Sequence, residues 1–303
     1  MTEIPHVILT GSSGFLGQAV RQSLGKRASC LSLRDPSWKS NPSPVEGSVV
    51  VHLAGLAHQR AREDEYHRVN VELTLAFAGW AEQRGAKRFI FFSSSKALGE
   101  ESPLSQSLGP EHPCRPTDPY GQSKQAAEEA LRAGFHNSPM EIVILRAPLI
   151  YGPGVKGNLL WLMRLLASGI PMPIRAWRSN LRSIAGLSNV VSCIELCLHH
   201  PDAGHRTFHI SDGEDVSTGE LICRLAEALG VKARELPLGP CFLEKFFRGI
   251  GQGELYQKLA GNFRLDIQDT RQVLGWRPIT PMKDEVAKMV KYFQNTVIPN
   301  STA

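Results

Sequence analysis

Three side chains suited to proton transfer occur in the order Ser94, Tyr120 and Lys124. Tyr120 and Lys124 are four residues apart, so on a helix they share one face. A free tyrosine has a pKa of about 10, which a nearby ammonium lowers by stabilising the phenolate. Of the five tyrosines, only Tyr120 has a lysine at this spacing. We therefore expect Tyr120 to act as a general acid or base, with its pKa lowered by Lys124 and with Ser94 hydrogen-bonded to the reacting oxygen.

A second chemical motif is the segment GSSGFLG at 11–17, which follows an apolar run and opens a helical pattern. Glycines permit a tight turn and let backbone N–H groups approach a pyrophosphate, which then rests on the positive end of the helix. A plain turn without a ligand is the alternative, but the position between a strand and a helix favours the ligand. The residues expected to contact a dinucleotide here are Gly11, Ser13, Gly14, Phe15, Leu16 and Gly17.

The end of the second expected strand bears on the choice between NAD and NADP. An acidic side chain there binds the ribose hydroxyl, whereas an arginine accepts the 2′-phosphate. The chain has both, as Leu33-Arg34-Asp35. If side chains alternate along the strand, Arg34 is the first residue to leave it. This favours NADP(H), and NAD(H) stays the alternative.

The elements that must position these residues alternate between apolar runs and helical patterns. We expect strands at 6–10, 29–33, 49–53, 88–92 and 142–146, and helices at 15–24, 64–84 and 119–133. This order predicts an α/β fold with a doubly wound parallel sheet of the Rossmann type. Ser94 then lies at the carboxyl end of a strand, the edge where ligands of such sheets bind.

Beyond Tyr151-Gly-Pro-Gly154 the pattern is less regular, with helices expected at 159–167, 189–199 and 218–229 and a strand at 207–210. We expect residues 1–154 to form the dinucleotide-binding domain, to which the chain returns at about 181–211. Residues 155–180 and 212–303 are expected to form a smaller C-terminal substrate domain.

Composition and charge exclude several classes. The 303 residues are 42% hydrophobic and 21% charged, which is typical of a globular protein. The net charge of +5 is mild, and the local cluster of Arg175, Arg178 and Arg182 suits a nucleotide diphosphate better than a nucleic acid. There is no apolar run long enough to span a membrane and no signal-peptide pattern, and six cysteines are thinly spread. We expect a cytoplasmic enzyme.

Two further segments have an ordinary and a functional interpretation. Cys193 and Cys197, followed by two histidines, suggest zinc, but no second cysteine pair completes a tetrahedral site, so we expect buried thiols and no metal. The aromatic segment 241–248 could form an interfacial membrane helix, but it is short, and we expect it to cover the substrate domain or act as a lid. His52 and His58 are given no catalytic role.

These motifs together resemble the extended short-chain dehydrogenase/reductase family, in its nucleotide-sugar epimerase, reductase and dehydratase branch. The resemblance covers nearly the whole chain, and its further motifs are His52-Leu-Ala-Gly55, Asn70-Val71, Arg146-Ala-Pro148 and Leu274-Gly-Trp-Arg-Pro278. It implies a UDP-linked sugar substrate and a homodimer formed through two long helices.

The resemblance also implies roles for individual residues. Ser94, Tyr120 and Lys124 would be catalytic, and the last two would also contact the dinucleotide. The remaining residues that would line the dinucleotide are Leu53, Ala54, Gly55, Asn70 and Pro148. Substrate would contact Ser95 and Lys96 beside the catalytic residues, with Asn158 at the nucleotide and Arg182 at the diphosphate. The alternatives are that Asn158 is a helix N-cap and Arg182 a surface charge.

The reaction expected from the resemblance depends on Ser95 and Lys96. Dehydratases of this branch carry Asp-Glu at these two positions, so elimination of water is disfavoured here. The pattern Ser-Ser-x-Lys, with Gly99-Glu100, resembles bacterial enzymes that reduce the C4 keto group of UDP-linked 6-deoxy-N-acetylhexosamines for surface polysaccharides such as O-antigen. We expect such an NAD(P)-dependent 4-ketoreductase. The alternatives are a UDP-hexose 4-epimerase with tightly bound NAD and a non-catalytic dinucleotide-binding redox sensor, which the intact catalytic set disfavours.

Overall fold

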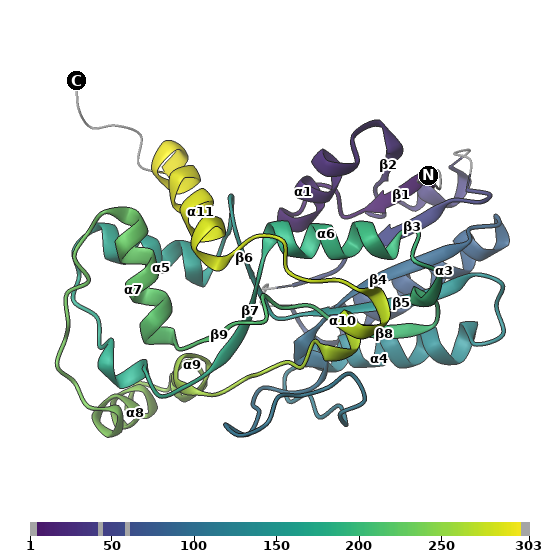
Figure 1. Cartoon of the computed structure of the whole chain (residues 1–303). Helices are drawn as coiled ribbons and strands as arrows, with labels where there is room; N and C mark the ends of the chain where they lie inside the picture. Colours follow the sequence, from purple (N-terminus) through teal and green to yellow (C-terminus); the bar gives the residue numbers. More distant parts are fainter. Residues whose placement is uncertain (1–4, 42–44, 58–60, 298–303) are drawn as a thin grey trace.

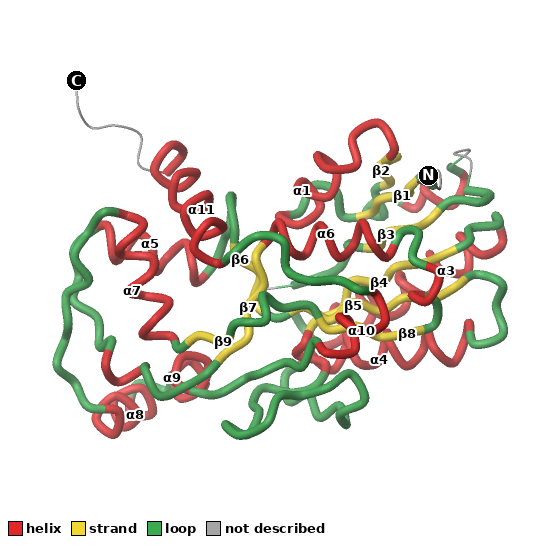
Figure 2. Tube along the Cα trace, viewed as in Figure 1, coloured by secondary structure: helices red, strands yellow, loops and turns green. Residues whose placement is uncertain are grey.

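The computed structural model describes residues 5–41, 45–57 and 61–297. Its main feature is a six-stranded parallel sheet in the order β2-β1-β3-β4-β5-β8 (Figures 1 and 2). The strands are β1 (Val7–Thr10), β2 (Ala28–Leu31), β3 (Val49–His52), β4 (Arg88–Ser94), β5 (Glu141–Ala147) and β8 (Arg206–His209). Most are near-continuous apolar runs, as expected for strands covered on both faces. The predicted doubly wound Rossmann-type sheet is confirmed.

Helices cover both faces of this sheet. On one face, α1 (Phe15–Leu24) and α6 (Leu187–Cys197) pack against side chains such as Val7 and Leu9. On the other, α3 (Leu73–Gln83) and α4 (Pro119–Phe135) pack against Ile8 and its neighbours. This alternation follows from the two-residue period of a strand.

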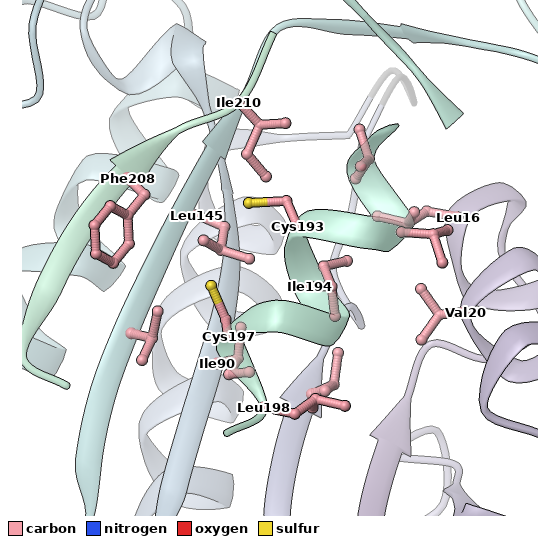
Figure 3. Packing of buried hydrophobic residues seen from close by; sticks show 14 of the residues in the cluster. Leu16, Val20, Ile90, Leu145, Cys193, Ile194, Cys197, Leu198, Phe208 and Ile210 are labelled. Carbon is pink, nitrogen blue, oxygen red and sulfur yellow. The ribbon is translucent and has the colours of Figure 1, made fainter. Parts of the chain in front are cut away.

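The thiols of Cys193 and Cys197 lie inside the first of these layers. Both residues are fully buried on α6, among Leu145, Phe208 and Ile210 of the sheet side (Figure 3). The expectation of buried thiols is confirmed. Among the described residues, no group of histidine, cysteine and acidic side chains is arranged to hold a metal ion.

A second hydrophobic core lies at the other end of the molecule (Figure 1). It is enclosed by a three-stranded sheet in the order β6-β7-β9 and by five helices. The elements are β6 (Leu149–Tyr151), β7 (Arg182–Gly186), β9 (Asp215–Val216), α5 (Asn158–Ala167), α7 (Thr218–Leu229), α8 (Pro240–Gly249), α9 (Gly253–Ala260) and α11 (Met282–Val297). The short helix α10 (Gln268–Leu274) lies outside this second core. Its Leu274 belongs to the first core, which α1 and α6 form with the main sheet.

The structure differs from three of the sequence-based expectations. The helix expected at 64–84 is divided into α2 (Glu63–His67), a π-helical turn (Arg68–Glu72) and α3. The strand β2 ends at Leu31, two residues early. Within 181–211, β7 pairs with β6 and β9, so only β8 joins the main sheet.

The aromatic segment 241–248 forms most of α8. Leu243 is buried in the second core, whereas Phe242 and Phe246 are exposed and stack with ring centroids 6.5 Å apart. The helix therefore covers the second core with one side only. None of the helices in the described part of the chain is long and apolar enough to cross a membrane.

Candidate active site

The predicted dinucleotide-binding and catalytic residues converge at the carboxyl edge of the main sheet. Thr10 ends β1 opposite His52 at the end of β3, and Ser94 ends β4 opposite Ala147 of β5. The segments that follow these four strands are the glycine loop, Leu53–Gly55, Ser95–Ala97 and Pro148. From β1 the chain continues to β2 on one side, whereas from β3 it continues to β4 on the other side. The carboxyl edge between β1 and β3 is therefore the topological switch point where such folds bind ligands.

The glycine loop has a shape that a side chain would block. Gly11 has φ +69°, and a Cβ there would lie 2.7 Å from the backbone nitrogen of Ala54. A Cβ on Gly17 would lie 2.1 Å from the carbonyl oxygen of Gly11. Gly14 is the N-cap of α1, so no side chain caps the first-turn N–H groups. This arrangement fits the pyrophosphate of a dinucleotide.

Asn70 ties the loop after β3 to α4. Its Oδ1 accepts a hydrogen bond from Leu56 N at 2.8 Å, and its Nδ2 donates to Leu56 O at 3.1 Å and to Ser123 Oγ at 2.9 Å. Asn70 is buried in the π-helical turn, a type of bulge frequent at functional sites. The turn explains why the helix at 64–84 is divided. A direct contact of Asn70 with the dinucleotide stays a prediction.

Tyr120 lies at the start of α4 with its hydroxyl hydrogen-bonded to that of Ser94. Burial raises the pKa of Tyr120 to about 12, which the bond to Ser94 opposes and the negative charge of Asp118 increases. The ring of Tyr66, from α2, packs at 6.0 Å from the Tyr120 ring. The structure thus brings together the predicted tyrosine and serine.

Lys124 is buried one turn further along α4. Its Nζ donates to Phe92 O at 3.0 Å and lies 4.6 Å from the Phe91 ring centre. Burial lowers the pKa of Lys124 to about 8, an effect that Glu128 opposes. The pKa of Tyr120 is not lowered as expected from the nearby Lys124, because burial of the phenol has the largest effect and raises this pKa. A Cβ on Gly55 would lie 3.5 Å from Lys124 Nζ, so this ammonium borders the expected dinucleotide site.

The two residues after Ser94 have different surroundings. Ser95 is buried at the start of a 3₁₀ turn (Ser95–Ala97). Lys96 is half-buried and forms ion pairs with Asp118 and with Glu100, the latter at 3.0 Å. Its ammonium is therefore already paired within the protein. Substrate contact by Ser95 and Lys96 stays a prediction.

The two predicted nucleotide-sugar residues lie on elements of the second core. Asn158 is exposed as the first residue of α5, and Gly157 is the N-cap, so the capping alternative is wrong by one residue. Arg182 is half-buried at the start of β7 and donates to Gly261 O at 3.0 Å. Burial lowers its pKa, while Glu100 and Glu101 oppose this effect. Arg182 is therefore more enclosed than an ordinary surface charge.

The Arg34 and Asp35 side chains are both exposed beyond β2. Asp35 accepts a hydrogen bond from Ser37 N at 2.7 Å and caps a 3₁₀ turn (Pro36–Ser40), a contact that lowers its pKa. Arg34 forms no ion pair with any residue that the structure describes. Of the two candidates, Arg34 is the side chain not engaged locally, which keeps the NADP interpretation open.

Sequence reasoning missed the contribution of Asp118 and Tyr66 to this site. Asp118 precedes Pro119 at the start of α4, and aspartate before proline is a typical helix-start pattern that could have identified the cap. Tyr66 has no local signal, because its contact with Tyr120 depends on the packing of α2 against α4. His52 is buried between Thr10 and Thr74, and burial lowers its pKa to about 3.

A dinucleotide cradle beside a serine, tyrosine and lysine at one sheet edge defines a Rossmann-type enzyme of the short-chain dehydrogenase/reductase kind. The family described as “NAD dependent epimerase/dehydratase family” matches residues 31–211, and the chain belongs to this family. The resemblance inferred from the sequence is confirmed.

Individual relatives are similar over most of the chain. A UDP-glucose 4-epimerase of Vibrio cholerae is 35% identical over 95% of each chain. An N-acetyl-alpha-D-glucosaminyl-diphospho-ditrans,octacis-undecaprenol 4-epimerase of Escherichia coli O157:H7 is 30% identical over 77% of this chain and 75% of its own. The crystal structure of a Thermus thermophilus UDP-glucose 4-epimerase with NAD has a TM-score of 0.77 at 21% identity, covering 96% of this chain and 99% of its own, and supports the fold.

Proposed function

We propose that this protein is a 4-epimerase of a diphosphate-linked hexose or N-acetylhexosamine, with UDP as the carrier. The observation that carries the proposal is the hydrogen-bonded pair of Ser94 and Tyr120, at the sheet edge that also holds the glycine loop. The two epimerase relatives support C4 as the reacting carbon, because both are 4-epimerases. They favour epimerisation over the 4-ketoreduction expected from the Ser-Ser-x-Lys pattern.

The residues of the chain divide the work of such a reaction. As the phenolate, Tyr120 Oη takes the proton of the C4 hydroxyl in the oxidation half, and as the phenol so formed it returns one to the C4 ketone in the reduction half. Ser94 Oγ hydrogen-bonds both Tyr120 and the same sugar oxygen. A bound nicotinamide dinucleotide supplies the hydride acceptor and donor. Lys124, beside Gly55 and buried, contributes positive charge between the phenol and the dinucleotide.

The diphosphate of the substrate is assigned to Arg182. It is half-buried on β7, and its only side-chain hydrogen bond to a described residue is the one to Gly261 O. An arginine with free N–H groups in a partly desolvated position binds phosphate strongly. Asn158, exposed at the start of α5, is assigned to the nucleotide.

A 4-ketoreductase is the second candidate, and Arg34 favours it. A reductase consumes its cofactor in every turnover and needs an exchangeable dinucleotide, commonly the phosphorylated form. Arg34 is exposed just past β2 and is not engaged with a described acidic residue, as a ligand of a 2′-phosphate would be. The redox-sensor alternative stays disfavoured, because it would not require the Ser94–Tyr120 contact.

The test measures both reactions on the same purified protein. An epimerase converts UDP-glucose or UDP-N-acetylglucosamine to its C4 epimer without added cofactor and without net absorbance change from reduced dinucleotide. A ketoreductase instead consumes one NADPH or NADH for each UDP-4-keto-6-deoxy-N-acetylhexosamine and leaves the UDP-sugars unchanged. Mass spectrometry of the retained dinucleotide and the Tyr120→Phe variant serve as controls. Consumption of the keto sugar without epimerisation would replace the first proposal by the second.

A further inference from the structure

Lys96 and Asp118 connect the two segments that hold the catalytic hydroxyls. Asp118 Oδ1 accepts a hydrogen bond from Gly121 N at 2.6 Å and so caps α4, which carries Tyr120. Its other oxygen accepts a hydrogen bond from Lys96 Nζ. The backbone nitrogen of Lys96 donates to Ser94 Oγ at 3.2 Å. One ion pair thus joins the end of β4 to the start of α4.

The backbones of these segments are also in close contact. A Cβ on Gly121 would lie 2.5 Å from the carbonyl oxygen of Lys96, so the position accepts only glycine. Lys96 is further held by Glu100 at 3.0 Å. Burial of Lys96 opposes its charge, but the hydrogen bonds to Asp118 and Glu100 outweigh this and raise its pKa. Both partners are about 30% exposed, at 31% and 30%, so the pair is screened from water on most sides.

We propose that the Lys96–Asp118 ion pair is a positioning device for the reaction, which holds Tyr120 against Ser94 and balances the negative charge that Asp118 places beside the phenol. Lys96 then acts through Asp118, in place of the direct substrate contact that the resemblance implies. The inference deepens the proposed function, because it rests on Tyr120 as the acid–base group.

Several charged side chains surround this part of the site. Asp118 raises the pKa of Tyr120 and that of Tyr66, whereas Lys96 lowers that of Tyr66. Lys124 lies one turn along α4, on the side of the dinucleotide site. Glu100 neutralises part of the charge of Lys96. Together with Glu101 it also raises the pKa of Arg182, against the effect of burial.

The two partners have effects of opposite sign on the phenol. Removal of the Asp118 charge stabilises the phenolate, so the pKa of Tyr120 falls. Removal of the Lys96 charge leaves Asp118 uncompensated, so the pKa of Tyr120 rises. Removal of both charges leaves a smaller net change than either single variant. At the distances of neighbouring side chains, each single shift should be about half a pH unit or more.

The experiment compares Asp118→Asn, Lys96→Met and the double variant. Asparagine is as good an N-cap as aspartate, so α4 keeps its start. The phenolate absorbance of each purified protein is titrated, with a Tyr120→Phe version of each variant subtracted to isolate Tyr120. This readout needs no substrate, so it can succeed even if the proposed epimerase activity fails. The pH profile of turnover is then measured on the substrate found for the wild type.

The expected result is a lower Tyr120 pKa in Asp118→Asn, a higher one in Lys96→Met and a value near the wild type in the double variant. The alkaline limb of the pH profile should move in the same directions, and Lys96→Arg should restore wild-type behaviour. Shifts of one sign in both single variants, or none, would overturn the inference. So would a Lys96→Met variant whose only defect is a raised KM, because that result would make Lys96 a substrate ligand.

Discussion

Proton transfer at the sheet edge centres on one phenol, that of Tyr120. Its ring packs against Tyr66 and its hydroxyl bonds Ser94, so Tyr120→Phe keeps the packing and removes only the ionisable oxygen. General acid–base groups contribute about 10² to 10⁴ in rate, and we expect a loss of that size in turnover with the retained dinucleotide unchanged. Single-turnover hydride transfer measures it. A loss below about tenfold would assign the proton to another group.

Lys124→Met is the companion variant. The Lys124 ammonium is buried beside Gly55 and close to Tyr120 along α4, so its loss should lower both turnover and dinucleotide retention. A variant that loses only turnover would leave Lys124 without a role in dinucleotide binding.

Arg34 allows a test of cofactor choice. Because charge-assisted contacts to phosphate are the stronger kind, the wild type should bind NADPH more tightly than NADH, and Arg34→Ala should weaken NADPH selectively. Fluorescence titration of both dinucleotides gives the ratio. Arg27, at the other end of β2, offers the matched control Arg27→Ala. Equal affinities in the wild type, or an unchanged ratio in Arg34→Ala, would contradict the assignment.

Arg182 allows a separate test of substrate anchoring. Arg182→Ala should weaken UDP binding, measured calorimetrically, while dinucleotide binding is unaffected. Exposed Arg178, a member of the same arginine cluster, gives the matched control Arg178→Ala. If UDP binds Arg182→Ala as tightly as the wild type, the diphosphate is held elsewhere.

At the scale of elements, the spacing of apolar residues predicted the helices and strands that depend on neighbouring residues in the sequence. The apolar runs predicted all six main-sheet strands within two residues, and the expected helices at 15–24 and 218–229 coincide with α1 and α7. The break in the helix at 64–84 was not predictable, because one extra residue in a turn leaves the apolar period nearly intact. In contrast, α11 has Val286, Met289, Val290 and Phe293 at helical spacing, so the sequence does carry a signal for this helix.

The candidate site likewise has one part that the sequence predicts and another part that only the folded chain reveals. The serine, tyrosine and lysine follow from spacing and strand ends, which the sequence displays directly. The pairing of Lys96 with Asp118 joins residues 22 positions apart across a 3₁₀ turn and a loop, and only the folded chain brings them together. The raised pKa of Tyr120 likewise depends on burial, which spacing alone does not give.

The attachment of α4 to the sheet depends on a buried ion pair, Glu128 with Arg146 of β5. Arg146 donates to Glu128 at 2.6 Å from Nη2, Ser93 Oγ donates to the same carboxylate, and both charged side chains are at most 2% exposed. Removing one partner of such a pair costs about 3–5 kcal/mol, because a buried charge is left uncompensated. We expect this loss for Arg146→Met in urea unfolding. The double variant Arg146→Met/Glu128→Leu should regain part of it, and a double variant less stable than the single one would contradict this account.

At the scale of the whole molecule, two hydrophobic cores meet near the site, and Phe15 of α1 packs against both. The division at residue 154 and the assembly into a homodimer through two long helices stay predictions, the latter to be measured by light scattering. The polar part of the junction is built around Asp212, which follows β8. Its carboxylate accepts hydrogen bonds from Tyr151 of β6 at 2.7 Å and from Asn189 of α6 at 2.7 Å.

This junction predicts a pH dependence of stability. Burial raises the pKa of Asp212, hydrogen bonds from Gly186, Tyr151 and Asn189 oppose the rise, and the fully buried Glu285 of α11 adds to it. A carboxyl with a raised pKa binds its proton more tightly in the folded than in the unfolded chain. Its contribution to stability is therefore present at low pH and is lost as the pH rises from the ordinary aspartate value through the raised one.

Asp212→Asn removes this titration and keeps an oxygen for Gly186 N and Asn189. The variant should gain stability relative to the wild type as the pH rises through that window, measured as the difference between their denaturation midpoints at each pH. Using the difference cancels the other titrating groups, which both proteins share. Asp284→Asn, which removes an exposed carboxylate from α11 beside Glu285, is the matched control and should not show this gain. A constant difference for Asp212→Asn would mean that the junction carboxyl titrates alike in the folded and unfolded chains, and the two cores would then be joined without a cost in buried charge.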